Sequence, residues 1–205
     1  IDLLKIEKHT RSMLSNLDKY KIVLASNSPR RKELLAGLDI AFEVKVNGDV
    51  DESYPDGLSP EEIPVYVAQR KADAYAPFLE KDELLITADT IVWTFEEVLG
   101  KPKDRQDAID MLSRLSNRVH EVITGVCIVT KNKKTSFAVS SAVSFGYLEL
   151  SDIEYYVDKY KPYDKAGSYG IQEWIGYVGA EAINGSFFNV MGLPVQRLYR
   201  ELKAF

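Results

Sequence analysis

The sequence SNSPRR at residues 26–31 has the composition of an anion-binding turn. It follows a short apolar run and leads into an expected helix, whose free N–H groups and positive dipole end attract anions. Arg30 and Arg31 in the first helical turn oppose that dipole at about 0.3–1 kcal/mol each, and a bound phosphate would reverse this penalty. Ser26 and Ser28 would add hydroxyl groups. The alternative is a pair of solvated arginines at an ordinary helix end.

Asp89 is the second candidate, because it interrupts the apolar run LLITADTIV at residues 84–92. We expect a buried strand to end beside it, which is a common place for active-site residues in open α/β sheets. An aspartate among apolar residues is unfavourable unless it is paired or holds a metal ion. In the alternative interpretation, its side chain simply caps a turn.

Two lysines and an acidic loop complete the set of residues that could act on a phosphate. Lys71 falls on an expected helix, and Lys101 precedes a proline. Single lysines are usually solvated. The loop DVDE at residues 49–52 could ligate a hard cation such as Mg²⁺ or Mn²⁺, or it could be an exposed acidic loop. Two histidines and one cysteine argue against a zinc site.

The composition excludes several classes of function. A net charge of −5 argues against a protein that grips nucleic acid over a broad surface. The apolar runs are too short to span a bilayer, and the first residues lack the apolar core of a secretory signal, so we expect no membrane association. The lone cysteine, Cys127, permits no internal disulfide and fits the reducing cytoplasm.

The elements that would position these residues follow from the hydrophobic pattern. We expect an amphipathic helical extension at residues 1–18 and a single domain at 19–205. Buried strands are expected at 21–25 and 84–88, the second resuming at 91–94, and a hairpin at 120–130 and 135–148. Helices are expected at 29–38, 64–75, from Asp104, from Ser151 to 160, and after Pro194. Pro64 would break a helix that began at the capping sequence SPEE of residues 59–62, so we begin it at Pro64. The fold class is α/β with a mixed sheet and flanking helices.

Several segments together resemble the Maf family of nucleoside triphosphate pyrophosphatases. The matching segments are SNSPRRKELL at 26–35, ADTIV at 88–92, GKP at 100–102, SNRVHEVITG at 116–125, DKAGSYGIQ at 164–172, INGS at 183–186 and NVMGLP at 189–194. The resemblance runs from about Lys21 to Leu202 and leaves residues 1–18 without a role. It implies two lobes around a central cleft, as in Maf and inosine triphosphatase-like folds, and often a homodimer.

The resemblance also implies a reaction and a set of roles. The reaction is hydrolysis between the α and β phosphates of a nucleoside triphosphate, with a divalent cation, Mg²⁺ or Mn²⁺. Asp89 matches the family's proton acceptor, and Glu52 matches a carboxylate of the metal and catalytic region, although Asp51 could be the equivalent. The phosphate-handling positions are matched by Ser26, Arg30, Arg31, Lys71 and Lys101. Positions linked to base selection are matched by Arg31, Thr90 and Gln172.

The form of the DKAGSYGIQ segment resembles the branch of the family that acts on dTTP and UTP. Glu173 departs from the pattern, since the family often has glycine after Gln172. Two alternatives stay open. One is a pyrophosphatase that clears modified purine nucleotides, and the other is a nucleotide-binding regulator of cell division without useful turnover. Asp89 together with an acidic metal candidate favours catalysis, because a sensor needs only the cations.

Overall fold

The computed structural model describes residues 13–46, 48 and 50–205, and their fold is α/β, as predicted. A seven-stranded mixed sheet has the order β2-β1-β3-β5-β6-β7, with β4 paired to β3. The strands are β1 (Lys21–Leu24), β2 (Phe42–Val44), β3 (Glu83–Trp93), β4 (Val98–Leu99), β5 (Val119–Val129), β6 (Lys134–Phe145) and β7 (Ala180–Asn184). Strands β1, β2 and β3 run parallel, and the other pairs are antiparallel.

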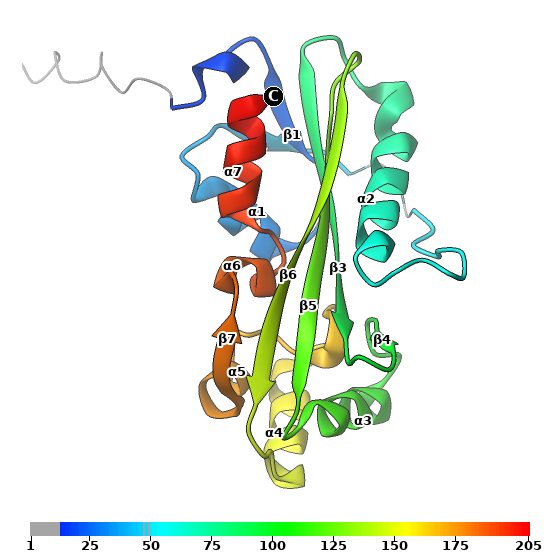
Figure 1. The fold of residues 1–205 in the computed structure, drawn as a ribbon, viewed down its shortest axis with the longest axis vertical. Coiled ribbons are helices and arrows are strands. Elements are labelled where there is room, and N and C mark those ends of the chain that lie inside the picture. Colours follow the sequence, from blue (N-terminus) through cyan, green and yellow to red (C-terminus); the bar gives the residue numbers. More distant parts are fainter. Residues whose placement is uncertain (1–12, 47, 49) are drawn as a thin grey trace, which may run out of the picture.

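The helices divide between the two faces and one end of the sheet. They are α1 (Pro29–Ala36), α2 (Glu62–Tyr75), α3 (Arg105–Leu115), α4 (Leu150–Tyr160), α5 (Trp174–Gly179), α6 (Phe187–Met191) and α7 (Val195–Ala204). Figure 1 shows α2 on one side of the long strands and α1 and α7 on the other, while α3, α4 and α5 gather at the far end. The larger apolar cluster joins α1, α3, α4 and α7 to the sheet, and a smaller one lies under α2.

Strand β3 corrects the expected position of Asp89. We expected the strand to end there, but β3 continues to Trp93, and Asp89 lies opposite Gly125 in an unbroken antiparallel ladder with β5. The parallel neighbour β1 ends at Leu24, beside Ile86. Strand β3 therefore loses its neighbour on one edge just before Asp89, and a crevice opens beyond the carboxyl end of β1.

Helix α2 begins two residues earlier than we predicted, at Glu62. The backbone N–H of Glu62 donates to Ser59 Oγ at 3.3 Å, and the backbone N–H of Ser59 donates to Glu62 Oε2 at 2.8 Å, which is a reciprocal capping box. Pro64 falls in the first turn, where a missing N–H interrupts no helical hydrogen bond. The prediction that Pro64 excludes residues 62 and 63 from the helix was wrong for this reason.

Other local predictions have mixed outcomes. Ser28 and Asp104 cap α1 and α3 with their side chains, and the β5–β6 hairpin forms as expected. The capping box predicted from Ser151 was wrong, because α4 begins at Leu150 after Glu149, without a side-chain cap. Most of the predicted helix at 1–18 lies outside the described residues. Within 13–18 there is only a 3-10 turn, at Ser15–Leu17, whose leucine is buried.

Five short helices and strands had no sequence prediction: β2, β4, β7, α5 and α6. Among the described helices, none combines the length and the apolar character needed to cross a membrane.

Candidate active site

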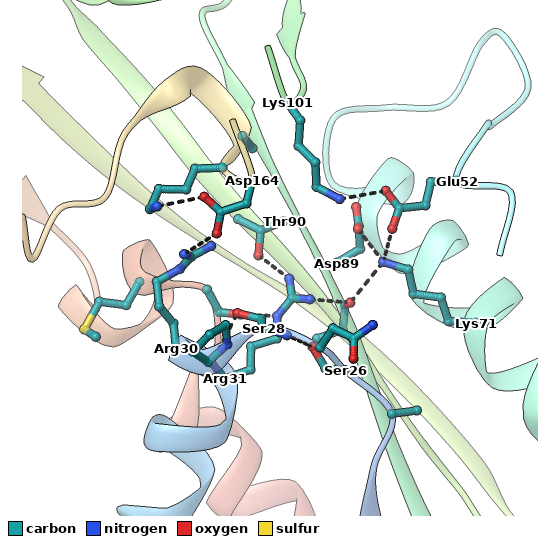
Figure 2. Close-up of a pocket in the computed structure, with 18 of the residues that line it drawn as sticks. Ser26, Ser28, Arg30, Arg31, Glu52, Lys71, Asp89, Thr90, Lys101 and Asp164 are labelled. Carbon is teal, nitrogen blue, oxygen red and sulfur yellow. Dashed lines mark hydrogen bonds and ion pairs between the residues drawn. The ribbon is translucent and has the colours of Figure 1, made fainter. Parts of the chain in front are cut away.

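A cleft of about 750 Å³ lies beyond the carboxyl end of β1. Its lining comes from the β1–α1 turn, α2, β3, β5, the 164–172 segment and the end of α6, together with Lys101 and the loop residues Val46, Gly48, Val50 and Glu52. It thus brings together segments far apart in the sequence, and every predicted site residue that the structure describes lines it, except Asp51. Asp49 of the acidic loop lies outside the described residues. Figure 2 shows the charged members of this set facing one another across the cleft.

The turn at residues 26–31 forms one wall of the cleft. Ser26 Oγ accepts a hydrogen bond from the Ser28 backbone N–H at 3.2 Å, and Ser28 Oγ accepts one from the Arg31 backbone N–H at 3.4 Å. These contacts hold the chain in the bend that directs α1 toward the cleft. Arg30 reaches across the opening and pairs with Asp164 at 3.1 Å. The helix N-terminus and the Arg30 guanidinium together make this wall suited to an anion.

Arg31 is bound to the protein by three hydrogen bonds. Its guanidinium donates to the carbonyl oxygens of Gly192 and Ala88, each at 2.9 Å, and to Thr90 Oγ1 at 3.0 Å. Burial lowers the pKa of this guanidinium from its usual value, while the charge of Asp89 acts in the opposite direction. Arg31 therefore joins α1 and the end of α6 to β3 on either side of Asp89.

Lys71 lies between the two predicted acidic residues. Its Nζ is 2.8 Å from Asp89 Oδ1 and 2.8 Å from Glu52 Oε1, and the other Glu52 oxygen is 3.3 Å from Lys101 Nζ. Burial raises the pKa of Glu52, but the two ammonium groups outweigh burial, so the pKa lies below its usual value. Lys71 and Asp89 side chains are each only 15% exposed, so their attraction is weakly screened by solvent.

The choice between Glu52 and Asp51 follows from the direction of the two side chains. Asp51 turns away from the cleft, where it accepts hydrogen bonds from the Ser53 backbone N–H and hydroxyl and lies 3.5 Å from Arg70. Glu52 points inward to Lys71 and Lys101 (Figure 2). The geometry thus favours Glu52 as the acidic residue of the site.

Two uncharged polar side chains, those of Thr90 and Gln172, also line the cleft. Thr90 Oγ1, which accepts from Arg31, also lies 2.9 Å from Thr124 Oγ1. Gln172 lines the cleft, and its buried Oε1 has no hydrogen-bond partner among the residues that the structure describes. A buried amide oxygen without a partner is unfavourable, by about 1–3 kcal/mol, unless a ligand donates to it.

Sequence reasoning gave no role to Asp164 and Lys165, although both lie in a quoted segment. Lys165 is almost fully buried and pairs with Asp164 at 2.8 Å, and Asp164 in turn meets Arg30. Burial raises the pKa of Asp164, but Lys165 and Arg30 outweigh burial and leave the pKa below its usual value. The sequence signal that could have identified them is an adjacent Asp–Lys pair within a segment rich in glycine and aromatic residues.

Two carboxylates of the cleft, those of Asp89 and Glu52, could hold a divalent cation. Asp89 and Glu52 both contact the same ammonium, so one hard cation could contact both carboxylates. No cluster of three or more His, Cys, Asp or Glu side chains suited to a metal ion occurs in residues 13–46, 48 and 50–205. Mg²⁺ is commonly held by one or two carboxylates together with substrate phosphates and water. The two carboxylates fit that mode of binding.

His120 and Cys127 are core residues. His120 is fully buried in β5, and its Nε2 lies 2.6 Å from the Tyr169 hydroxyl. Burial lowers the pKa of this imidazole to about 4. The Cys127 thiol is buried, which raises its pKa. Neither side chain lines the cleft.

Comparison with known proteins finds relatives of this chain. The family model described as Maf-like protein matches residues 21–205. A dTTP/UTP pyrophosphatase of Parabacteroides distasonis is 68% identical, over 94% of this chain and 100% of that protein. Proteins of the same name from Bacteroides fragilis and Porphyromonas gingivalis are 62% and 56% identical, over 93% and 94% of this chain and 99% and 98% of their own.

Among solved structures, one similar chain is a nucleoside-triphosphatase / dITP/XTP pyrophosphatase from Mycobacterium abscessus. It has a TM-score of 0.42 and 14% identity, and the match covers 90% of this chain and 96% of that one.

Proposed function

This chain belongs to the family of Maf-like proteins, and we propose from that membership that it is a pyrophosphatase that hydrolyses dTTP and UTP to the monophosphate and pyrophosphate. The observation that carries the proposal is the position of Lys71. Its ammonium lies between the carboxylates of Asp89 and Glu52, in a cleft that also holds an N-terminal helix end with Arg30. Cations beside a carboxylate that can accept a proton are what phosphoanhydride hydrolysis needs.

Substrate binding would exchange ion-pair partners. Arg30, Lys71 and Lys101 each pair with a carboxylate of the protein. A triphosphate brings oxygens that compete for the same cations, and arginine can bind two phosphate oxygens at once. The backbone N–H of Arg30, in the first turn of α1, adds a donor that is fixed by the helix. The polyanion would thus lie along the wall formed by the 26–31 turn, with Lys71 and Lys101 opposite.

We assign the proton transfer to Asp89. The Asp89 carboxylate orients a water molecule and takes a proton from it as the water oxygen bonds to the α phosphorus. The bridging P–O bond between the α and β phosphates breaks, and pyrophosphate leaves with the electron pair of that bond. Lys71 and Lys101 stabilise the charge that develops on the phosphate oxygens. The hydrogen bonds from Arg31 to the Ala88 carbonyl and to the Thr90 hydroxyl hold the two neighbours of Asp89, which keeps its carboxylate directed into the cleft.

We propose that Asp89 and Glu52 hold a divalent cation, Mg²⁺ or Mn²⁺. When bound, such an ion neutralises phosphate charge and polarises the phosphorus. The support is the pair of carboxylates that meet at Lys71. Lys71 then has a second task, since it keeps the two carboxylates close together before the ion and the substrate arrive.

We assign base selection to Gln172, Thr90 and Arg31, following the family resemblance. We further propose that the enzyme acts in the cytoplasm, where nucleoside triphosphates are abundant and a lone thiol stays reduced. A homodimer, which the resemblance implies, stays a prediction that light scattering tests.

The deciding measurement is pyrophosphate release from a panel of nucleoside triphosphates, with Mg²⁺ or Mn²⁺ and with chelator. Release from dTTP and UTP that stops on chelation is expected. A preference for a modified purine nucleotide would retain the reaction and overturn the substrate. Binding without release from any nucleotide would favour a regulatory role.

The role of Asp89 is tested by Asp89→Asn, which keeps the size of the side chain and removes its basicity. We expect turnover to fall by at least about 10²-fold, the usual contribution of a general base, with an unchanged unfolding transition. A variant that retains the wild-type rate would remove Asp89 from the mechanism.

A further inference from the structure

Glu173 lies directly behind the wall of the cleft. The preceding residue, Gln172, lines the cleft, whereas Glu173 does not. Its carboxylate is 21% exposed and faces the body of the protein. Glu173 stands where the family often has glycine, so its contacts are specific to chains that carry a longer side chain at this position.

Those contacts hold the turn at residues 170–173 from both sides. The Tyr156 hydroxyl donates to Glu173 Oε2 and accepts the backbone N–H of Gly170 at 3.0 Å. The Glu173 backbone N–H donates to the Gly170 carbonyl at 3.0 Å, which closes the turn. Tyr156 is fully buried in α4. The turn that carries Gln172 is thus fixed to the hydrophobic core through one hydroxyl and one carboxylate.

Gly170 allows the two side chains to lie over the turn together. A Cβ at this position would lie 3.1 Å from Glu173 Oε2 and 3.2 Å from Gln172 Nε2. The carboxylate and the amide nitrogen therefore lie on the same side of Gly170 without a direct hydrogen bond between them, and the negative charge favours the amide N–H end on that side through its electric field. The other end of the amide, Oε1, is the buried atom without a hydrogen-bond partner in the described part of the chain.

The orientation of that amide matters for base recognition. Uracil and thymine carry an N–H donor at N3, whereas cytosine carries an acceptor there. An amide free to rotate could present its oxygen to uracil or its nitrogen to cytosine and would separate the two poorly. An amide held with its oxygen toward the ligand favours uracil and thymine, because cytosine would leave two acceptors facing each other.

We propose that Glu173 is a positioning residue that fixes the Gln172 amide for recognition of the N3–H edge of uracil and thymine. The inference rests on the proposed function for its substrate class. Glu173 Oε1 also lies 3.4 Å from Lys165 Nζ, which pairs with Asp164 and, through it, with Arg30. The base-reading turn and the phosphate-binding turn are thus joined by one chain of ion pairs.

The test compares selectivity between bases, since loss of folded protein or of one negative charge affects all nucleotides alike. Dissociation constants for UMP and CMP are measured by calorimetry, and kcat/KM for UTP and CTP by pyrophosphate release. The variants are Glu173→Ala, alone and together with Gln172→Ala, and Tyr156→Phe. The control is Glu154→Ala, which removes a carboxylate that is 46% exposed on α4 and outside the cleft.

We expect wild-type protein to favour UMP by at least about ten-fold, and Glu173→Ala to lower that ratio by about ten-fold. Tyr156→Phe should lower it in the same direction, and Glu154→Ala should not change it. With Gln172→Ala already present, Glu173→Ala should have no further effect on the ratio.

An unchanged ratio in stably folded Glu173→Ala would overturn the proposal, and so would an equal loss of affinity for both nucleotides. Should that variant fail to fold, an unchanged ratio in Tyr156→Phe would overturn it too. Wild-type protein without a preference between UMP and CMP would have the same consequence. Wild-type protein that binds UMP selectively but releases no pyrophosphate would refute the proposed function alone, and the UMP to CMP ratios of the variants would still decide the role of Glu173.

Discussion

Adding one methyl group at Gly125 tests whether the contact between α2 and β5 holds Lys71 in place. A Cβ at Gly125 would lie 2.3 Å from the Pro64 carbonyl carbon and 2.3 Å from the Val65 backbone nitrogen. Both atoms belong to the backbone of α2, so no side-chain rotation relieves the clash. In Gly125→Ala, the first turns of α2 must therefore move away from the sheet by about 1 Å or more to restore ordinary contact of about 3.5 Å.

That movement affects the site because Gly125 pairs with Asp89 and α2 carries Lys71. The Lys71–Asp89 contact is 2.8 Å, and a second link, from Thr87 Oγ1 to the Ala68 carbonyl, is 2.6 Å. A shift of about 1 Å lengthens both. Overpacking of this kind destabilises a fold by about 1–3 kcal/mol, and misplacement of a catalytic group by about 1 Å lowers the rate by about 10²-fold.

The assay pairs urea unfolding with kcat for UTP, measured where the variant is fully folded. Gly100→Ala is the control for stability, because a Cβ there meets no atom within 4 Å. We expect that control to unfold like the wild type. A Gly125→Ala protein with wild-type stability and kcat would refute the view that this close approach positions Lys71.

Two further predictions concern acid stability and the metal site. Burial holds the pKa of His120 at about 4, so below pH 6.5 the unfolded chain takes up a proton that the folded protein refuses. The free energy of unfolding therefore falls by up to about 3 kcal/mol as the pH falls from 6.5 to 4. Urea unfolding of His120→Gln should show a smaller loss of stability over this pH range. An equal loss in the variant would show that His120 is not the source of the effect. Glu52→Gln should raise the Mg²⁺ concentration needed for half-maximal rate by about ten-fold, while Asp51→Asn, which makes the same change outside the cleft, should not. If Asp51→Asn raised the required Mg²⁺ concentration and Glu52→Gln did not, Asp51 would be the metal ligand.

The sequence was sufficient to predict the fold class and most of the residues that meet in the cleft. Strong local signals carried this success: the Ser28–Pro29 start of α1, the long alternating runs of β5 and β6, and the Asp104 cap. Short elements such as β2, β4 and β7 escaped prediction because two to five residues carry too little periodicity, and their strand state depends on neighbours distant in the sequence.

The details of the site depended on contacts that no local pattern contains. Asp51 and Glu52 are adjacent acids, and only their distant partners separate them, since Arg70 lies beside one and Lys101 beside the other. Arg31 matched a phosphate-handling position, yet its nearest acceptors include the Gly192 carbonyl, 161 residues further along the chain. Such partners follow from the packing of α1 against α6, which the sequence pattern did not predict.

The pairing of three cleft cations with protein carboxylates has a consequence for product release. Without a ligand, Arg30, Lys71 and Lys101 are already neutralised by Asp164, Asp89 and Glu52. A triphosphate displaces these carboxylates together, because its phosphate groups are covalently joined. Their binding costs the translational and rotational entropy of only one molecule. Once the chain of phosphates is cut, each fragment competes alone with carboxylates that are permanently present. The same ion pairs that substrate binding breaks would thus expel the two products as they re-form, and turnover would continue in a cell where monophosphate and pyrophosphate are always present.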